Sequence, residues 1–260
     1  MVVARHELKR GAVATAIWCA VITFMLSVTV LIYPQMKSQM AEVTNAFSEM
    51  GSFSSAFGMD RLNFGEFMGY FAVECGNVLG LGGALFAAIY GISAIAKEEK
   101  EATAEFLYTQ PISRMRVIAE KYLALIFQVV ALNVAVCGIS LCCILAIGES
   151  VDFGVLFLLF LSYLILQIEI ASVCFGLSAF VGKGSTAVGI GFAFLLYFLN
   201  IVANITDKAK VLTYVTPFAY CDGADIAATS SLEWKYVAVG AALTVIGAAA
   251  AFLKYRKKDL

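Results

Sequence analysis

Residues 97–116 read KEEKEATAEFLYTQPISRMR, and the long apolar segments 70–96 and 117–147 lie on either side of them. Eight of these 20 residues are Lys, Glu or Arg, although charged residues make up only 14% of the chain. Long apolar segments on both sides indicate a protein that crosses a membrane. We therefore interpret the charged stretch as a part that meets a partner in the cytoplasm.

The composition of the whole chain agrees with a membrane protein. Of 260 residues, 61% are hydrophobic, and the mean hydropathy is +0.87. A soluble domain usually has about 45–50% apolar and about 25% charged residues. The net charge of −1 gives no support to nucleic acid as a partner. We therefore expect an integral membrane protein in contact with lipids.

Six segments are long and apolar enough to cross a bilayer, which takes about 20 residues. We expect them to be helices, because an isolated span must satisfy its own backbone hydrogen bonds. The first is expected to be a retained anchor rather than a cleaved signal. The predicted fold is an all-α membrane protein with one domain, residues 1–260. The spans are 11–33, 70–96, 117–147, 155–181, 186–206 and 233–253.

The distribution of Lys and Arg predicts the orientation of these spans. With the N-terminus inside, 13 of the 18 Lys and Arg residues fall on the inner side and 5 on the outer side. Cytoplasmic segments carry the excess of such residues. Both termini are therefore expected to be cytoplasmic, which agrees with an even number of spans.

The outer segment 34–69 is too long for a simple turn. Phe47, Met50, Phe53 and Phe57 recur at spacings of three and four residues, so they share one helical face. We interpret this segment as an amphipathic helix at the outer interface. The alternative is a disordered loop.

The charged stretch has features of a docking helix. Its pattern is helical to about Tyr108 and turns before Pro111, because proline disfavours helix in the preceding residue. Ser113 is placed to cap the next helix. Phe106 and Leu107 give the short helix apolar side chains that could fill a groove on a partner. The alternative is an ordinary inner loop.

Residues 95–123, IAKEEKEATAEFLYTQPISRMRVIAEKYL, resemble the hallmark segment of type-2 ABC transporter permeases. The segment 6–10, Tyr33-Pro34, Phe57–Asp60 and Thr216–Phe218 look like parts of the bacitracin-exporter-like and sodium-efflux-like branch. Ala102 departs from the pattern, since many relatives have Gly there. The matching residues in the hallmark segment are Glu98, Glu99, Thr103, Glu105, Leu107, Pro111, Ser113, Arg114 and Lys121.

The resemblance implies a permease subunit of an ATP-driven exporter in the cell membrane, expected to be bacterial. Two such subunits would pair above two separate ABC ATPase subunits, which would hold ATP and magnesium. The segment 97–113 would be the coupling helix that receives ATPase motion. The substrate would be amphipathic, peptide, drug-like or lipid-like. The expected coupling residues are Glu98, Glu99, Glu101, Thr103, Glu105, Phe106, Leu107, Pro111, Ser113 and Arg114.

The sequence contains no arrangement that predicts an enzyme. His6 is the one histidine, and no metal-ligand spacing or paired carboxylates stand out. The segment 176–186 superficially resembles a phosphate loop but fails on spacing. We expect no catalytic residue, no metal and no cofactor in this chain.

Glu169 is an ionisable residue near the centre of a predicted span. Such a residue should face protein or water rather than lipid. One interpretation is that it lines a substrate path, together with Phe194, Tyr197 and Asn200 of the next span. Phe192 belongs to the same aromatic-rich stretch. The alternative is that Glu169 binds a polar neighbour such as Gln167, Gln128 or Asn133 and holds helices together.

Two other classes of membrane protein remain open at this point. An ion-coupled secondary transporter or channel would normally show several ionisable groups in its spans or broken helices. A non-transporting anchor or immunity protein is the second alternative. ATP-dependent transport with a co-purified ATPase would separate these classes from an ABC permease.

The predicted orientation can be tested by labelling single cysteines in a variant without the seven native ones. A cysteine at position 45 should react only with reagent added outside, and one at position 183 only with reagent added inside. The reason is the 13-to-5 distribution of Lys and Arg. Labelling of position 45 only from inside would overturn this topology.

Overall fold

The computed structural model describes residues 2–49, 51, 54, 66–100, 113–181 and 186–256. These residues form helices and short connections, and no strand occurs among them. Six of the helices are long and apolar enough to cross a membrane. The chain is therefore a multi-pass membrane protein, as the sequence predicts.

The structure confirms all six predicted spans, with adjusted ends. The largest adjustment concerns α1, which begins nine residues before position 11 and continues well past position 33. The chain-order elements are α1 (Val2–Glu49), α3 (Phe67–Cys75), η2 (Gly76–Leu81), α4 (Gly82–Lys100), α6 (Arg114–Ile147), α7 (Phe153–Ser178), α8 (Thr186–Ile205), η3 (Asp207–Tyr214), η4 (Pro217–Cys221), α9 (Gly223–Thr229) and α10 (Trp234–Arg256).

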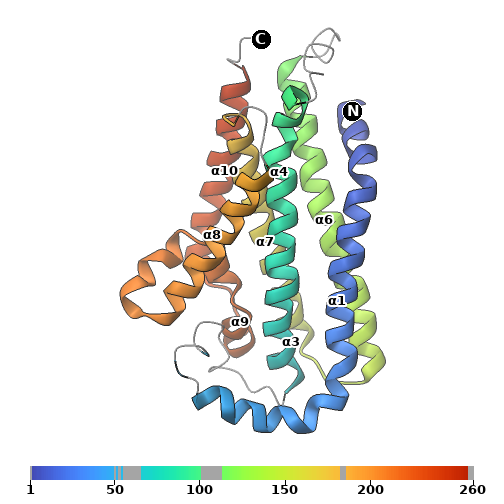
Figure 1. The fold of residues 1–260 in the computed structure, drawn as a ribbon, viewed down its shortest axis with the longest axis vertical. Helices are drawn as coiled ribbons and strands as arrows, with labels where there is room; N and C mark the ends of the chain where they lie inside the picture. The colour runs from blue at the N-terminus through green and yellow to red at the C-terminus, as the bar shows by residue number, and fades with distance from the viewer. Residues whose placement is uncertain are drawn as a thin grey trace.

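Helix α1 bends instead of ending where the span was predicted to end. Pro34 lies inside it and removes one backbone hydrogen bond, which is a common cause of a kink. Figure 1 shows the part after the bend running across the end of the bundle. The backbone of 34–49 is thus helical, but the side chains expected to form an amphipathic face lie outside the described residues.

The centre of the bundle is the contact between α4 and α7. Glycines of the second span face side chains and backbone of α7. A Cβ at Gly83 would lie 2.1 Å from Gln167 Nε2, and one at Gly91 would lie 2.6 Å from the carbonyl oxygen of Ala171. Small residues let helix backbones approach closely in a membrane, where burial of apolar surface gives little drive for association.

The second span is not a regular α-helix. Between α3 and α4, residues Gly76–Leu81 form a π-helical segment, η2. Such a segment accommodates one extra residue in the helix and is frequent at functional sites. The apolar pattern of residues 70–96 gave no indication of it.

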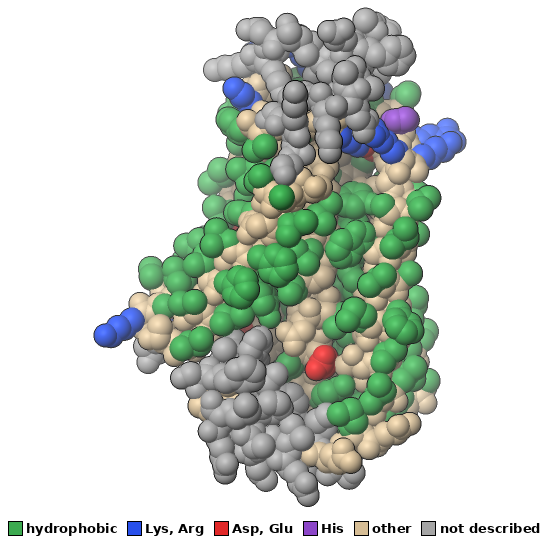
Figure 2. Space-filling model, viewed as in Figure 1, with side chains coloured by type: hydrophobic (Ala, Val, Ile, Leu, Met, Phe, Trp, Pro, Cys, Tyr) green, Lys and Arg blue, Asp and Glu red, His purple; other side chains and the backbone are tan. Residues whose placement is uncertain are grey.

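The long helices expose hydrophobic side chains to the surroundings along most of their length. Figure 2 shows hydrophobic side chains over the middle of the molecule and Lys and Arg gathered near the N-terminus. Val2 and Arg256, the ends of the described helices, lie at the same end of the bundle (Figure 1). We call it the terminal end. That this end faces the cytoplasm stays a prediction.

Three short helices connect α8 to α10. Helix α8 leans away from the bundle, with η3 at its far end (Figure 1). The chain then returns through η4, where Thr216 Oγ1 donates a hydrogen bond to the carbonyl oxygen of Leu196, 2.8 Å away. This return places η4 against α7, where Tyr220 reaches Glu169.

A pair of identical substitutions tests the close contact of α4 and α7. Gly91→Ala should destabilise the protein by about 1–3 kcal/mol, because its Cβ would meet backbone that cannot move aside. Gly191→Ala is the control, since a Cβ there meets nothing within 4 Å. Helical Gly→Ala alone stabilises by about 0.5–1 kcal/mol. Equal thermal unfolding of the two variants in detergent would contradict the packing described.

Candidate functional site

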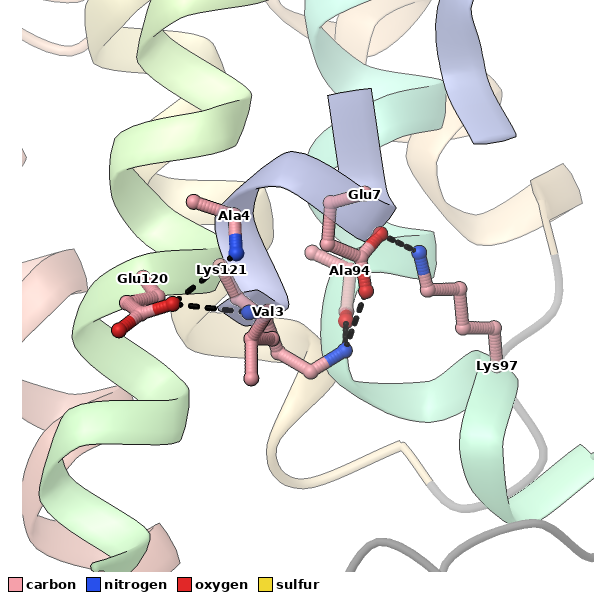
Figure 3. Close-up of polar contacts among 7 residues, drawn as sticks. All are labelled: Val3, Ala4, Glu7, Ala94, Lys97, Glu120 and Lys121. Atoms are coloured by element: carbon pink, nitrogen blue, oxygen red, sulfur yellow. Dashed lines mark hydrogen bonds and ion pairs between the residues drawn. The ribbon is translucent and has the colours of Figure 1, made fainter. Parts of the chain in front are cut away.

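A buried carboxylate at the terminal end joins three spans. Glu7 of α1 accepts a hydrogen bond from Lys121 Nζ of α6 at 2.9 Å and another from Lys97 Nζ of α4. Lys121 Nζ also donates to the carbonyl oxygen of Ala94, 3.0 Å away (Figure 3). We call Glu7, Lys97 and Lys121 the Glu7 cluster. It ties α1, α4 and α6 together.

The Glu7 cluster is largely removed from water. The side chain of Lys121 is 1% exposed and that of Glu7 is 11% exposed. Burial of an ion costs several kcal/mol, so an ammonium group is stable here only beside a carboxylate and further acceptors. Loss of either partner would leave an uncompensated charge among the helices.

A second carboxylate next to this cluster holds the start of α1. Glu120 Oε2 accepts hydrogen bonds from the backbone N–H groups of Val3 (2.9 Å) and Ala4 (3.1 Å), as Figure 3 shows. Its Oε1 accepts from Arg116 Nε at 2.9 Å. The first N–H groups of a helix have no partner within the helix, and a carboxylate satisfies them well. Glu120 therefore caps α1 from α6.

These contacts lie at both ends of the predicted coupling segment. Lys97, the first residue of that segment, belongs to α4, and Arg116, Glu120 and Lys121 belong to α6 after it. Both flanks are thus bonded to α1. A displacement of the segment between them would act on three spans at once.

The structure describes only part of the predicted coupling helix. Residues 97–100 continue α4, so a separate helix does not begin at Lys97 as expected. Arg114 is the first residue of α6, and Ser113 caps that helix, its Oγ accepting from Arg116 N at 3.4 Å, as predicted. The other predicted coupling residues lie outside the described part, either with their side chain or as whole residues. They are Glu98, Glu99, Glu101, Thr103, Glu105, Phe106, Leu107 and Pro111.

Glu169 is buried in α7, with 4% of its surface exposed. Its Oε2 accepts a hydrogen bond of 2.8 Å from the hydroxyl of Tyr220 in η4. A Cβ at Gly240 of α10 would lie 2.2 Å from the same oxygen, so α10 encloses the carboxylate closely. Tyr220 is not among the polar neighbours named as examples from the sequence; one of these, Gln167, bonds Asn133 and the Leu79 carbonyl oxygen.

An apolar cavity of about 250 Å³ lies beside Glu169, between α7, α8 and α10. Phe192 and Leu196 of α8 line it, together with Ile170, Val173 and Leu243. A mostly apolar space with one polar group suits a small amphipathic molecule. The structure therefore brings Glu169 and Phe192 together at one cavity.

The other residues of the predicted substrate path lie elsewhere on α8. The ring of Phe194 stacks on that of Phe198 at 6.2 Å. Tyr197 and Asn200 line a separate cavity of about 60 Å³, which Tyr163 of α7 and Gly76 of η2 also line. We call this second cavity the Tyr163 pocket. The predicted path thus divides into two cavities in contact with α8.

Sequence reasoning missed several residues of these sites. Lys121 and Glu120 fall inside the predicted span 117–147, and ionisable residues in a span indicate a buried partner. Tyr220 gave no signal, because it lies 51 residues from Glu169 in a loop of ordinary composition. Tyr163 gave no signal within the predicted span 155–181.

The family described as ABC-2 family transporter protein matches residues 1–260. No curated protein matches the chain.

Removal of the Glu7 charge should loosen the terminal end. Glu7→Gln should destabilise the protein by about 3–5 kcal/mol, because two ammonium groups lose their shared carboxylate. The measurement is thermal unfolding of the purified protein in detergent.

The ion pair of Lys37 and Glu149 supplies a matched control. Lys37 Nζ lies 2.8 Å from Glu149 Oε1, and the Lys37 side chain is 49% exposed. Exposed pairs contribute at most about 1 kcal/mol, so Glu149→Gln should change stability little. Similar losses in the two variants would show that burial does not set the strength of the Glu7 cluster.

Proposed function

Because the chain belongs to the ABC-2 family of transporter proteins, whose members are membrane components of transport, we propose that it exports an amphipathic substrate with ATP hydrolysed by separate subunits. The proposed assembly has two ATPase subunits, which hold ATP and magnesium, and a second permease that is a copy or a homologue. The proposed location is the bacterial cytoplasmic membrane. Assignment to the bacitracin-exporter-like branch rests on the sequence resemblance and belongs to the same proposal.

The Glu7 cluster is the observation that carries the proposal. It bonds α1, α4 and α6 to one another through Lys97, the first residue of the segment 97–113, and through Lys121, which follows the segment. A segment that receives motion from a partner must be joined to the spans by contacts that do not break when the segment is displaced. Buried, hydrogen-bonded ion pairs meet this requirement, because breaking one leaves a buried charge.

The route of the motion follows from the packing. A push on residues 101–112 would act on α4 and α6, and the Glu7 cluster would carry α1 with them. Helix α4 packs on α7 through glycines, so these two helices would move together. Helix α8 contacts α4 through Gly189, whose Cβ would lie 2.8 Å from the carbonyl oxygen of Ala88. The cavities beside α8 would change shape as a result.

The proposed class of substrate rests on the cavity beside Glu169. Its lining is apolar apart from the carboxylate. Molecules with an apolar body and one polar or cationic group match such a lining, which includes peptides, lipid-like and drug-like compounds. Direction of transport comes from the family resemblance of the coupling segment.

Double substitution of Phe106 and Leu107 tests the coupling segment. Truncation of one anchor at an interface centre often costs about 2 kcal/mol or more, which is about 30-fold in affinity. Phe106→Ala with Leu107→Ala should therefore detach or uncouple the ATPase while the six spans stay inserted. The measurements are co-purification of the ATPase and ATP-dependent transport at equal membrane expression.

Glu101→Gln is the control for this experiment. A charge at the rim of an interface usually contributes less than a central apolar anchor. This variant should keep most ATPase binding and transport. Normal binding and transport in the double variant would remove residues 97–113 as the docking element.

A further inference from the structure

The Tyr163 pocket is a small polar cavity within one subunit. It lies between the second span, α7, α8 and the segment η4–α9. A water-sized group requires about 10–15 Å³ of such space. The pocket volume of about 60 Å³ therefore holds an ammonium group with the carbon attached to it.

Two oxygen atoms of this pocket are buried without a hydrogen-bond partner among the described residues. They are the hydroxyl oxygen of Tyr163 and Oδ1 of Asn200. The side chain of Tyr163 is only 1% exposed. A buried polar atom without a partner costs about 1–3 kcal/mol, so native proteins rarely keep one without a reason. Two such atoms in one small pocket indicate a bound group that forms hydrogen bonds with both of them.

The helix backbone keeps space beside the Tyr163 hydroxyl. A Cβ at Gly76 would lie 3.0 Å from this oxygen. Gly76 is also the first residue of η2, where the second span departs from α-helical geometry. The glycine therefore leaves room for the hydroxyl beside the start of η2, where a side chain would crowd it.

The polar groups of the pocket select a donor with positive charge. Asn200 Oδ1 can only accept hydrogen bonds, and a tyrosine hydroxyl can accept as well as donate. Asp222 adds a carboxylate whose Oδ1 caps α9 and whose Oδ2 accepts from Asn204. The described lining contains no Lys, Arg or His. Acceptors with a nearby carboxylate match a cation that carries N–H groups.

We propose that the Tyr163 pocket binds the ammonium group of a primary amine. The amine is the head of the transported molecule or of an amine-bearing lipid, since both present the same chemistry. The identification of the amine with the transported molecule rests on the proposed export function. Binding to the pocket itself does not.

Binding of n-octylammonium to the purified full-length chain tests this inference. The chain is placed in nanodiscs of phosphatidylglycerol, which has no amine, and the melting temperature is followed as the amine is added. A ligand that binds the folded state raises the melting temperature, and the rise grows with the logarithm of the ratio of ligand concentration to Kd. We expect Tyr163→Phe and Asn200→Leu each to weaken the affinity about tenfold or more, because each removes a hydrogen bond to a charged group.

Three controls make the result specific. Ser140→Ala removes another buried hydroxyl without a described partner, on α6 and outside this pocket, and should leave the affinity unchanged. Octyltrimethylammonium keeps the charge but has no N–H donor, so it should bind more weakly. Without ligand, Tyr163→Phe should melt at the same or a higher temperature, because it removes only an unpaired oxygen.

A second set of nanodiscs distinguishes the two sources of the amine. If phosphatidylethanolamine raises the melting temperature of the native chain but not of Tyr163→Phe, the lipid head is the occupant. If it raises neither and n-octylammonium retains its effect, the occupant is a soluble or transported amine. Either result supports the pocket.

Equal affinity of n-octylammonium for the native chain and both pocket variants would overturn the inference. So would equal binding of the trimethylated analogue, or no effect of either amine source on the native chain. Because no ATPase is present, these outcomes leave the proposed export function untouched. That function fails separately, through the Phe106 and Leu107 variants.

Discussion

Lys121 holds an ammonium group almost completely out of water, and the arrangement of the terminal end follows from the need to neutralise it. Its carboxylate partner Glu7 comes from α1, 114 residues away along the chain. Because Lys97 shares that carboxylate, α4 is drawn into the same contact. The buried charge of Lys121 thus fixes the mutual position of α1, α4 and α6.

The remaining helices are held by a different kind of contact. Helices α4 and α7 approach through glycines, and α8 buries only four residues on one narrow face: Gly189, Ala193, Leu196 and Ala203. Van der Waals packing of small residues is the ordinary means of association in lipid. Helix α8 is therefore less firmly held than α4 and α7. Both the apolar cavity and the Tyr163 pocket border this helix.

The sequence was sufficient for the number, type and approximate bounds of the spans, because length and hydropathy determine them. It was insufficient for the bend of α1, since a proline can end a helix as well as kink it. Residues of the site were predictable from the sequence only where an ionisable residue lies in an apolar segment. Glu169 stood out as an ionisable group in an apolar segment, but Tyr220 became its partner only through the fold, as Glu7 became the partner of Lys121. Asn200 was named for a substrate path, but its pairing with Tyr163 carries no sequence pattern, because what the two share is a buried oxygen without a partner among the described residues.

The π-helical segment η2 also fixes which side chains of the second span face inward. Successive residues of an α-helix are rotated by about 100° around its axis. Because η2 takes up one extra residue in a wider turn, the same residues in regular α-helical form would turn α3 by about that angle relative to α4. Phe71, which is completely buried, would then leave the core, although no helix would be lost. The irregular turn therefore acts as a phase correction between two halves of one span, and a homologue of the same length without it would need a different set of inward-facing residues on one side.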